Sequence, residues 1–296
     1  MPRILECVPN ISEGTDLEKV EQIVNEVRMV EGVKLIDYSS DKDHNRSVIT
    51  YLGEPEAVVE ATYRLAKKAC ELIDMTQHHG GHPRMGAIDV IPLIPIDGIT
   101  TEEAIEMSKQ LAERIGNDAQ ISVTLYEQSA SAPHRENLAD IRRGQYEEMA
   151  TKIKQPEWIP DFGPKDLNPK TGVVALGVRP PLIAYNINLA TSDVSIAKEI
   201  ANAIRFAKGG FRYCKSMGLL IEETGRAQVS MNLVNPDFTT IYRVFDTVER
   251  EAHAHGTYVT DSEIVGLVPM KNLIDTAKYH LKLKGFEMNQ ILERNL

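Results

Sequence analysis

Short apolar runs alternate with segments of helical periodicity in the first quarter of the chain. The runs at 3–9, 33–37 and 47–52 predict buried strands, because apolar residues gather there between turn residues. After the first run, Leu17–Val27 places apolar residues at the spacing of one helix face, and Val58–Leu72 does the same after the third run. The predicted order is β-α-β-β-α, which is a split β-α-β pattern.

The same order returns in the last part of the chain. The pattern predicts strands at 182–189, 219–222, 228–233 and 258–267, with helices at 193–206 and 238–252. The two parts have no obvious sequence identity, so the repeat is one of topology. We therefore predict an α/β (α+β) protein of two subdomains, each of β-α-β-β-α-β type, with a ligand cleft between them.

The segment that follows the first helices is apolar but interrupted by proline. Residues 87–96 contain Pro92 and Pro95, which favours an edge strand or an extended segment over a central strand. Thr100 and Glu103 then have the spacing of a capping box, which predicts the start of another helix.

Further along, the sequence predicts a strand at 121–126 and a helix at 136–153. Residues 155–181 are dense in proline and glycine and have little helical periodicity. Such a shift in composition is typical of a linker at a domain boundary. We place the first domain, which carries the histidine-rich loop described below, at 1–178, and the second at 179–296.

Composition narrows the functional classes. The 296 residues carry 33 Lys and Arg against 43 Asp and Glu, and this net charge of −10 disfavours nucleic-acid binding. No apolar run approaches the roughly 20 residues that a membrane span needs, and charges near the N-terminus disfavour a secretion signal. The three cysteines, Cys7, Cys70 and Cys214, are too few and too widely spaced for a disulfide framework or a CxxC zinc site. We expect a cytoplasmic protein that acts on small molecules.

The densest cluster of polar side chains is the segment HHGGHPR at His78–Arg84. An imidazole, whose usual pKa is about 6.5, can take up and release a proton near neutrality. Pro83 restricts His82 to extended conformations, so Arg84 would point to the same side and could hold an anionic substrate. The pattern favours catalysis by His82, and the alternative is a solvent-exposed polar loop.

A metal site is the competing interpretation of this cluster. His78 and His82 are four residues apart, which is the spacing that places two ligands on one face of a helix. Gly80–Gly81 and Pro83 disfavour a helix at this point. A metal-dependent hydrolase that uses these two histidines and Asp89 therefore requires the fold to bring the three together.

A second polar segment, 161–172, combines turn residues with Lys165 and Lys170. The two lysines could bind carboxylates, and the prolines and glycines set a rigid path for the chain. A plain linker is the alternative. The sequence contains no GxGxxG, Walker A or GxSxG motif, so nucleotide-phosphate and serine-hydrolase chemistry lack support.

Several motifs, in order along the chain, resemble the glutamate formimidoyltransferase (formiminotransferase) family. They are ECVPNISEG at 6–14, DHNRSV at 43–48, HPRMGAIDV at 82–90, the glycines and prolines from Phe162 to Arg179, and NINL at 186–189. The resemblance covers essentially the whole chain. It implies two α/β subdomains with a tunnel between them, a homodimer, and a stand-alone enzyme without the cyclodeaminase domain that animal proteins carry.

The resemblance also implies a reaction and a set of site residues. The formimidoyl group would pass from N-formimidoyl-L-glutamate to N5 of tetrahydrofolate, the co-substrate, in histidine degradation and with no metal. His82 would be the catalytic acid and base, and Arg84 and Arg179 are candidates to contact substrate carboxylates. The folate-binding loop would comprise Gly163, Pro164, Lys165, Asp166, Leu167, Asn168, Pro169, Lys170, Thr171 and Gly172.

This transfer reaction needs a group that first accepts a proton and then donates it again. One imidazole can take the proton from the attacking N5 and return it to the departing glutamate nitrogen, and this is the role expected of His82. Two alternatives remain open at this point: N-formyl-L-glutamate as donor, which would give 5-formyltetrahydrofolate, and a non-catalytic folate-binding protein. Asn168 stands where many members of the family have His.

Overall fold

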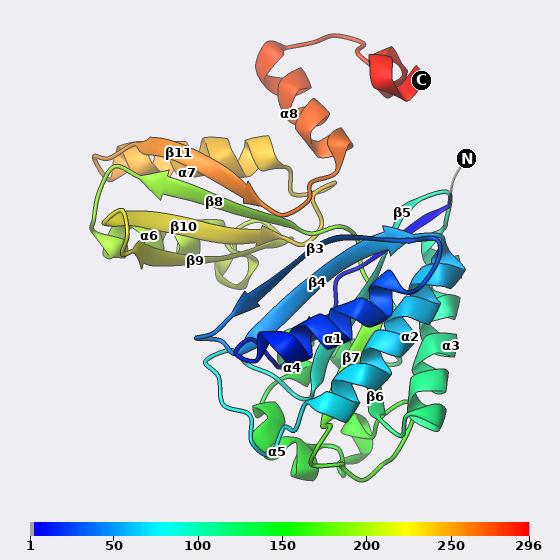
Figure 1. Ribbon diagram of the computed structural model, residues 1–296. Helices are drawn as coiled ribbons and strands as arrows, with labels where there is room; N and C mark the ends of the chain where they lie inside the picture. Colours follow the sequence, from blue (N-terminus) through cyan, green and yellow to red (C-terminus); the bar gives the residue numbers. More distant parts are fainter. Residues whose placement is uncertain (1–2, 296) are drawn as a thin grey trace. The chain divides into compact units, whose positions relative to one another are not determined.

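The computed structural model describes residues 3–295, which form two compact units that divide after Arg179 (Figure 1). The first unit is built around a seven-stranded sheet and the second around a four-stranded sheet. Each unit has its own hydrophobic core.

The sheet of the first unit joins an antiparallel half to a parallel half. β3 pairs with β4, which pairs with the short strands β1 and β2, and these two pair with β5; all of these pairs are antiparallel. β5 then pairs with β7, and β7 with β6, in parallel. The strands are β1 (Ile4–Cys7), β2 (Asn10–Ile11), β3 (Val33–Asp41), β4 (Arg46–Gly53), β5 (Ile88–Asp97), β6 (Ser122–Glu127) and β7 (Val173–Val178).

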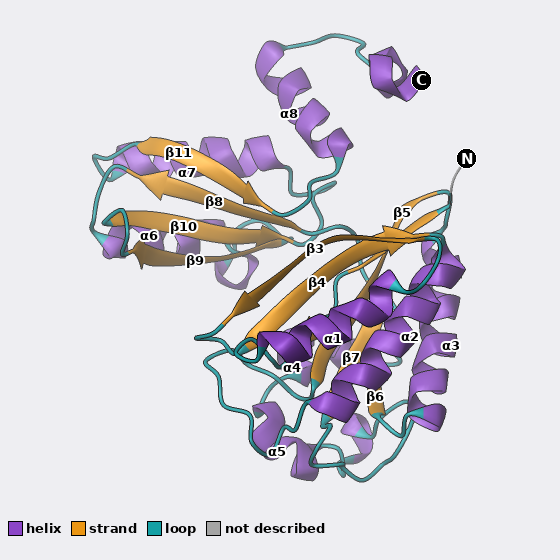
Figure 2. Ribbon diagram, in the orientation of Figure 1, coloured by secondary structure: helices purple, strands orange, loops and turns teal. Residues whose placement is uncertain are grey.

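Three long helices cover one face of this sheet (Figure 2). They are α1 (Leu17–Arg28), α2 (Pro55–Leu72) and α3 (Thr101–Asp118). Asp16 caps α1 by accepting the backbone N–H of Lys19 at 3.2 Å. Thr100 and Glu103 form the predicted capping box at the start of α3. Fully buried side chains such as Leu65 hold the helices on the sheet, each worth about 1.5–3 kcal/mol by transfer from water.

The prediction that 87–96 avoids the middle of the sheet is wrong, because β5 has β1 and β2 on one side and β7 on the other. Pro92 fits there because the neighbouring strand is interrupted opposite it, between β1 and β2. Val8 donates its N–H to the Pro92 carbonyl at 3.4 Å. Pro92 has no backbone N–H to donate to the carbonyl of Val8. That carbonyl accepts a hydrogen bond from the side-chain amide of Asn10 at 3.0 Å instead.

The segment 155–181 is only in part a connection, which corrects the prediction of a linker. Its residues Val173–Val178 form β7, which is buried along its whole length between β5 and β6. A short strand that is buried on both faces lacks the alternation of polar and apolar residues that marks a strand in a sequence. The surrounding prolines and glycines therefore concealed it.

The helix predicted at 136–153 is instead two helices, α4 (Leu138–Ile141) and α5 (Gln145–Lys152). Gly144 separates them with a φ of +87°, a left-handed conformation that ends the helical path. Single helical turns, η1 (Pro133–Arg135) and η2 (Pro156–Trp158), lie before and after this pair.

The second unit has the strand order β11-β8-β10-β9, and every pair is antiparallel. Its elements follow the predicted β-α-β-β-α-β order, and a helix that the sequence pattern did not indicate, α8, comes after them. They are β8 (Ile183–Leu189), α6 (Val194–Ile204), β9 (Cys214–Ile221), β10 (Arg226–Leu233), α7 (Ile241–Ala254), β11 (Val259–Val265) and α8 (Met270–Leu281), with short turns η3 (Phe206–Lys208), η4 (Met288–Gln290) and η5 (Leu292–Asn295).

The two units share one strand arrangement. In the second unit the first strand, β8, lies between β11 and β10, and β9 lies outside β10. In the first unit β1 and β2 lie between β5 and β4, β3 lies outside β4, and β7 and β6 extend the sheet beyond β5. The fold class of two α/β subdomains is thus confirmed, and the ligand cleft between them stays a prediction.

The three cysteines are buried free thiols within their units. Burial raises the pKa of Cys7 and of Cys70 to about 12 and that of Cys214 to about 11, which keeps all three protonated and unreactive near neutrality. None of the helices between residues 3 and 295 combines the length and the apolar character that a bilayer span requires.

Candidate active site

The turn 43–46 and the loop 78–82 lie against each other in the first unit. Gly80 permits this contact, because a β-carbon at this position would lie 2.3 Å from the carbonyl oxygen of His44. Gly81 then donates its backbone N–H to the carbonyl of Asp43 at 3.1 Å. Two motifs that are far apart in the sequence therefore form one surface.

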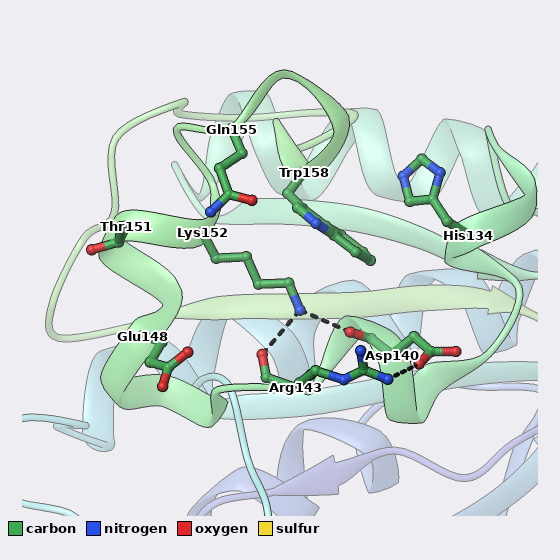
Figure 3. A pocket seen from close by; sticks show the side chains of 8 residues that line it. All are labelled: His134, Asp140, Arg143, Glu148, Thr151, Lys152, Gln155 and Trp158. Carbon is green, nitrogen blue, oxygen red and sulfur yellow. Dashed lines mark hydrogen bonds and ion pairs between the residues drawn. The ribbon is translucent and has the colours of Figure 1, made fainter.

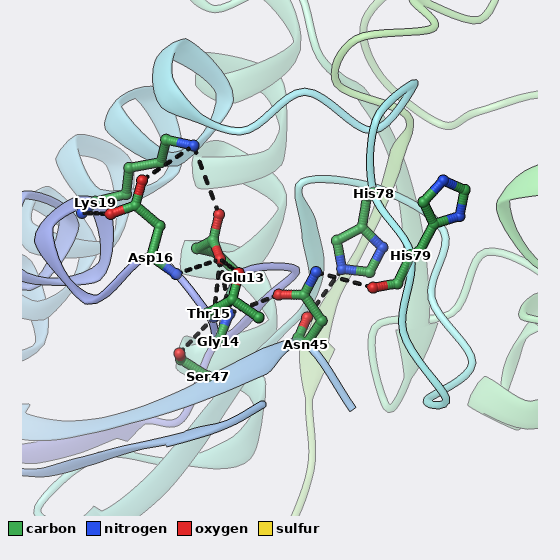
Figure 4. Close-up of polar contacts among 9 residues, drawn as sticks. All are labelled: Glu13, Gly14, Thr15, Asp16, Lys19, Asn45, Ser47, His78 and His79. Carbon is green, nitrogen blue, oxygen red and sulfur yellow. Dashed lines mark hydrogen bonds and ion pairs between the residues drawn. The ribbon is translucent and has the colours of Figure 1, made fainter. Parts of the chain in front are cut away.

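Asn45 connects the turn 43–46 to the loop 78–82 and to the chain before α1 through hydrogen bonds (Figure 4). Its side-chain oxygen accepts the N–H of Gly14 at 2.9 Å, and its side-chain nitrogen donates to the carbonyl of His79 at 2.9 Å. Its own carbonyl lies 2.9 Å from Nε2 of His78. Asn45 thereby links three segments of the chain, with a φ of +46° that asparagine tolerates better than most residues.

Glu13 organises the chain before α1 (Figure 4). Its Oε1 accepts the backbone N–H groups of Gly14, Thr15 and Asp16 at 2.9–3.1 Å and the hydroxyl of Thr15 at 2.9 Å. Burial alone would raise the pKa of Glu13, but the hydrogen bonds from Asp16 and Thr15 and the charge of Lys19 outweigh it and lower that pKa. Glu13 is therefore a fixed anion at neutral pH.

Two arginines and one aspartate form a charged cluster beneath this surface. Arg142 forms an ion pair with Asp89, which is 2% exposed and also accepts the N–H of Met85 at 3.0 Å. Arg46, at the start of β4, donates to the side-chain oxygen of Asn10. Burial raises the pKa of Asp89, and the charges of Arg142 and Arg46 oppose that rise.

His82 lies half-buried beside these cations. Burial lowers its pKa to about 4, and the positive charges of Arg46 and Arg142 add to the effect. The imidazole is therefore uncharged at pH 7. Its Nδ1 is buried and makes no hydrogen bond within the described residues.

A hollow of about 470 Å³ opens next to His82. Its lining residues come from β3, β4 and the two loops, and they are Ser39, Ser40, Asp41, His44, Arg46, Val48 and His82. His44 lies edge-on to His82, with 6.1 Å between the ring centroids, and its Nδ1 is 2.7 Å from a carboxylate oxygen of Asp41. The hollow thus presents two imidazoles, one guanidinium and one carboxylate to a small molecule.

Arg84 lies close to the loop but is engaged within the unit. Its guanidinium pairs with both carboxylate oxygens of Glu147, at 2.6 and 2.9 Å, and its Nε lies 3.3 Å from Nδ1 of His78. A contact between Arg84 and a substrate carboxylate would require this ion pair to open. Arg179 follows β7, where its charge opposes the burial that raises the pKa of Glu6, and it does not line the hollow beside His82.

The loop 163–172 runs next to the segment that carries His82. The carbonyl of Thr171 accepts the N–H of Ala87 at 2.8 Å, and the N–H of Val173 donates to Met85 at 3.1 Å. Gly172 makes the approach possible, because its φ is +70° and a β-carbon there would lie 2.2 Å from the Met85 carbonyl. Residues 165, 166 and 168–170 are exposed, so the loop is fixed at its end and open along its middle.

A second hollow, of about 540 Å³, lies around Trp158 (Figure 3). Lys152 crosses it with its ammonium 4.1 Å from the centre of the Trp158 ring. The same ammonium donates to the carbonyls of Asp140, Ile141 and Arg143 at 2.6–3.0 Å. Lys152 thereby caps the C-terminal end of α4, because its ammonium binds carbonyls that have no partner within the helix.

Comparison with known proteins places both units in one family. Residues 4–179 match the family model described as the formiminotransferase domain, N-terminal subdomain, and residues 184–293 match the formiminotransferase domain model. The chain belongs to the formiminotransferase family. The resemblance that the motifs indicated is thereby confirmed.

Named relatives of this formiminotransferase are similar over nearly its whole length. It is 48% identical over 297 residues to a glutamate formimidoyltransferase of Streptococcus pyogenes serotype M1. The matched region covers 100% of this chain and 99% of that protein. A glutamate formimidoyltransferase of Thermoplasma acidophilum is 44% identical and covers 99% and 97%. Formimidoyltransferase-cyclodeaminase of Mus musculus is 38% identical and covers 95% of this chain but 53% of the mouse protein. The chain is thus an enzyme of the transferase class.

The sequence did not single out two cations of this formiminotransferase site, Arg46 and Arg142. Arg46 lies inside the DHNRSV motif, which was a signal for its importance but not for its partner. Arg142 lies in a polar stretch 60 positions after His82, and only the fold brings its charge to bear on that imidazole.

His78, His82 and Asp89, the groups proposed for a metal-dependent hydrolase, line one small cavity, but two of them are engaged with other side chains or backbone groups. His78 contacts Asn45 and Arg84, and Asp89 is paired with Arg142. Between residues 3 and 295, no three His, Cys, Asp or Glu side chains are grouped so that they could hold a metal ion. The structure therefore places His82 beside two arginines and the imidazole of His44, and not within a set of three ligand groups in the described part of the chain.

Proposed function

We propose that this formiminotransferase transfers the formimidoyl group from N-formimidoyl-L-glutamate to N5 of tetrahydrofolate, giving 5-formimidoyltetrahydrofolate and L-glutamate, with His82 as general acid and base. The names of relatives at 44–48% identity support the reaction. The observation that carries the role of His82 is its position: a neutral, half-buried imidazole with one unpartnered ring nitrogen, beside two guanidinium groups.

The reaction begins when N5 attacks the carbon of the donor's protonated amidine. A new carbon–nitrogen bond forms, and the electron pair of the C=N double bond moves to the terminal nitrogen, which becomes a neutral amine. N5 becomes positively charged and acidic in the tetrahedral intermediate, so that even a weak base can take its proton. His82, uncharged at pH 7, accepts that proton.

The second half of the reaction returns the same proton. The imidazolium of His82 is a strong acid in this environment, because burial and the neighbouring cations disfavour its charge. It protonates the glutamate nitrogen as the old carbon–nitrogen bond breaks, and L-glutamate leaves as a neutral amine at that nitrogen. The proton balance closes on one side chain, and alignment of the two substrates supplies much of the remaining acceleration.

The loop 163–172 is our candidate for the folate-binding segment. Its support is its place beside the His82 segment, through the pairs Ala87–Thr171 and Met85–Val173. Lys165 and Lys170 are exposed and carry positive charge in an otherwise acidic chain, which suits the carboxylates of a folate. The ammonium of Lys170 also donates to the carbonyl of Glu71 at 2.9 Å, so a folate carboxylate would share it with that carbonyl.

N-formyl-L-glutamate is the second candidate donor, because a C=O group differs little in shape from a C=NH group. A two-donor assay tests the choice. Metal-stripped protein is given tetrahydrofolate with either donor, and the folate product is identified. Turnover with formimidoylglutamate supports the proposal, turnover with formylglutamate alone would replace the donor, and folate binding without turnover would support a non-catalytic folate-binding protein. Activity that only returns with added metal would favour a metal enzyme.

The wider expectations from the family belong to the same proposal. We expect the enzyme to act as a homodimer in the cytoplasm, in histidine degradation, and with no metal. Sedimentation of the purified protein tests the first expectation directly, since a dimer has twice the 33.1 kDa of one chain.

A further inference from the structure

Two guanidinium groups in the first unit keep a donor unused beside His82. Arg46 uses one terminal nitrogen on Asn10, and Arg142 uses one on Asp89. The Nε atoms of both arginines are buried and have no hydrogen-bond partner in the described chain, as is also true of Nδ1 of His82. A buried charged donor without an acceptor is costly, so the two Nε atoms indicate a ligand that carries acceptor oxygens.

The charges around these atoms also call for an anion. Arg142 and Arg46 disfavour each other's charge, because the positive charge of Arg142 adds to the burial that lowers the pKa of Arg46. One buried carboxylate, Asp89, lies close enough to act on both. Asp41 also acts on Arg46, but its carboxylate is 53% exposed and water screens its charge. Among the less exposed groups, two cations therefore face one anion, which leaves a local excess of positive charge.

The donor's chemistry says which anion belongs there. In N-formimidoyl-L-glutamate the α-carboxylate is bonded to the carbon that carries the departing nitrogen. Whatever group protonates that nitrogen must therefore lie near the α-carboxylate. The carboxylates of tetrahydrofolate are separated from N5 by the whole p-aminobenzoyl group, and those substrate groups must lie well away from His82.

We propose that Arg46 and Arg142 bind the α-carboxylate of the formimidoyl donor and so hold its departing nitrogen against His82. This inference rests on the proposed function. Asn10 and Asp89 are positioning residues in this arrangement, because each fixes one terminal nitrogen and leaves the other donors of its arginine for the ligand.

A cycle of two donors and two proteins tests the proposal. The donors are N-formimidoyl-L-glutamate and N-formimidoyl-4-aminobutyrate, which lacks the α-carboxylate, and the proteins are the wild type and Arg46→Gln. Removal of the carboxylate should lower kcat/KM of the wild type about 10- to 100-fold, the range of a lost charge-assisted hydrogen bond. With the complete donor, kcat/KM of Arg46→Gln should be about 10- to 100-fold lower than that of the wild type. In Arg46→Gln, the truncated donor should have almost the same kcat/KM as the complete donor. The KM for tetrahydrofolate should not change.

The neighbouring arginines supply a second variant and a control. Arg142→Lys keeps a positive charge opposite Asp89 but removes the Nε donor, and it should also lower kcat/KM for the complete donor selectively. Arg143→Gln removes an adjacent arginine whose side chain is 80% exposed and paired with Asp140. This control should leave both donors unaffected. Thermal unfolding of each variant verifies that it is folded.

Two results would overturn the inference. One is a further drop with the truncated donor in Arg46→Gln as large as in the wild type, which would mean that the arginine and the carboxylate act independently. The other is a loss that falls on the KM for tetrahydrofolate. Should the wild type turn over neither donor, the proposed reaction fails, and calorimetry still decides the site: the wild type should bind L-glutamate but not 4-aminobutyrate, and Arg46→Gln should bind neither.

Discussion

Asn45 donates its side-chain amide to the carbonyl of His79 at 2.9 Å, and this bond joins the turn before β4 to the loop that carries His82. The same side chain accepts the N–H of Gly14 at 2.9 Å. The position of the loop that carries His82 therefore depends on a residue that does not line the hollow of about 470 Å³.

Asn45→Gly tests the contribution of the side-chain amide of Asn45 without a change in the backbone conformation at this position. Glycine adopts the φ of +46° without strain, so only the side-chain hydrogen bonds are lost. We expect kcat to fall about 10- to 100-fold through misplacement of the loop, while KM for either substrate changes little. Steady-state kinetics measure the split. A kcat equal to that of the wild type would show that the loop holds its shape without Asn45.

Gly80 and Gly81 offer a matched pair of substitutions. A β-carbon at Gly80 would lie 2.3 Å from the backbone carbonyl of His44, which cannot move aside, whereas at Gly81 the nearest atom is 3.6 Å away. Gly80→Ala should therefore lower both stability and activity, and Gly81→Ala should be tolerated. Thermal unfolding and turnover of both variants test this. Equal behaviour of the two would contradict the close packing of the loop on the turn.

Arg46→Gln should raise the pKa of His82. Burial is the main cause of its low value of about 4 and remains in the variant, as do the charges of Arg142 and His44, but the contribution of Arg46 disappears. The imidazole signals in NMR spectra recorded from pH 3 to 8 report the change directly. A pKa of His82 that stays the same or falls would contradict the arrangement of charges.

Glu13 should contribute stability that acid removes. Its pKa is lower in the folded protein than in the unfolded chain, so its contribution is complete above an unfolded pKa of about 4.3 and is lost as the pH falls through the lower folded value. Glu13→Gln should cost about 1.5–3 kcal/mol at pH 7, because a neutral amide accepts the backbone N–H groups less strongly.

Denaturant unfolding at pH 7 and at pH 3 tests this prediction. The gap between the wild type and Glu13→Gln should be smaller at pH 3. His82, whose pKa is also lowered, changes stability in the same direction, but it is present in both proteins and cancels in the comparison. A gap that is constant with pH would mean that the charge of Glu13 does not matter.

The sequence predicted most elements because their signals are local. The Thr100–Glu103 pair marks a helix start through hydrogen bonds between residues three positions apart, and this capping box is present in the structure. The position of β5 was wrong because Pro92 is tolerated only through the break between β1 and β2 in a neighbouring strand. Such a compensation is visible only once the strands are paired.

The site shows the same division between local and long-range information. His82 could be singled out from its own segment, because Gly81 and Pro83 beside it suggest a constrained loop. Its low pKa could not, since that depends on burial in the folded unit and on the charges of Arg46 and Arg142, which reach it from β4 and from the end of α4. The sequence predicted Arg84 as a contact for a substrate carboxylate, but Arg84 forms an ion pair with Glu147, which lies on a helix far along the chain.

Replacement of His82 by Ala tests the central claim most directly. Turnover of N-formimidoyl-L-glutamate with tetrahydrofolate is measured beside calorimetric binding of tetrahydrofolate, and His79→Ala, which changes an exposed histidine of the same loop, serves as the control. We expect kcat of His82→Ala to fall about 10²- to 10⁴-fold with folate binding unchanged, as for the loss of a general acid and base, and His79→Ala to retain activity. Turnover that survives in His82→Ala, or folate binding that is lost along with it, would contradict the catalytic role of His82.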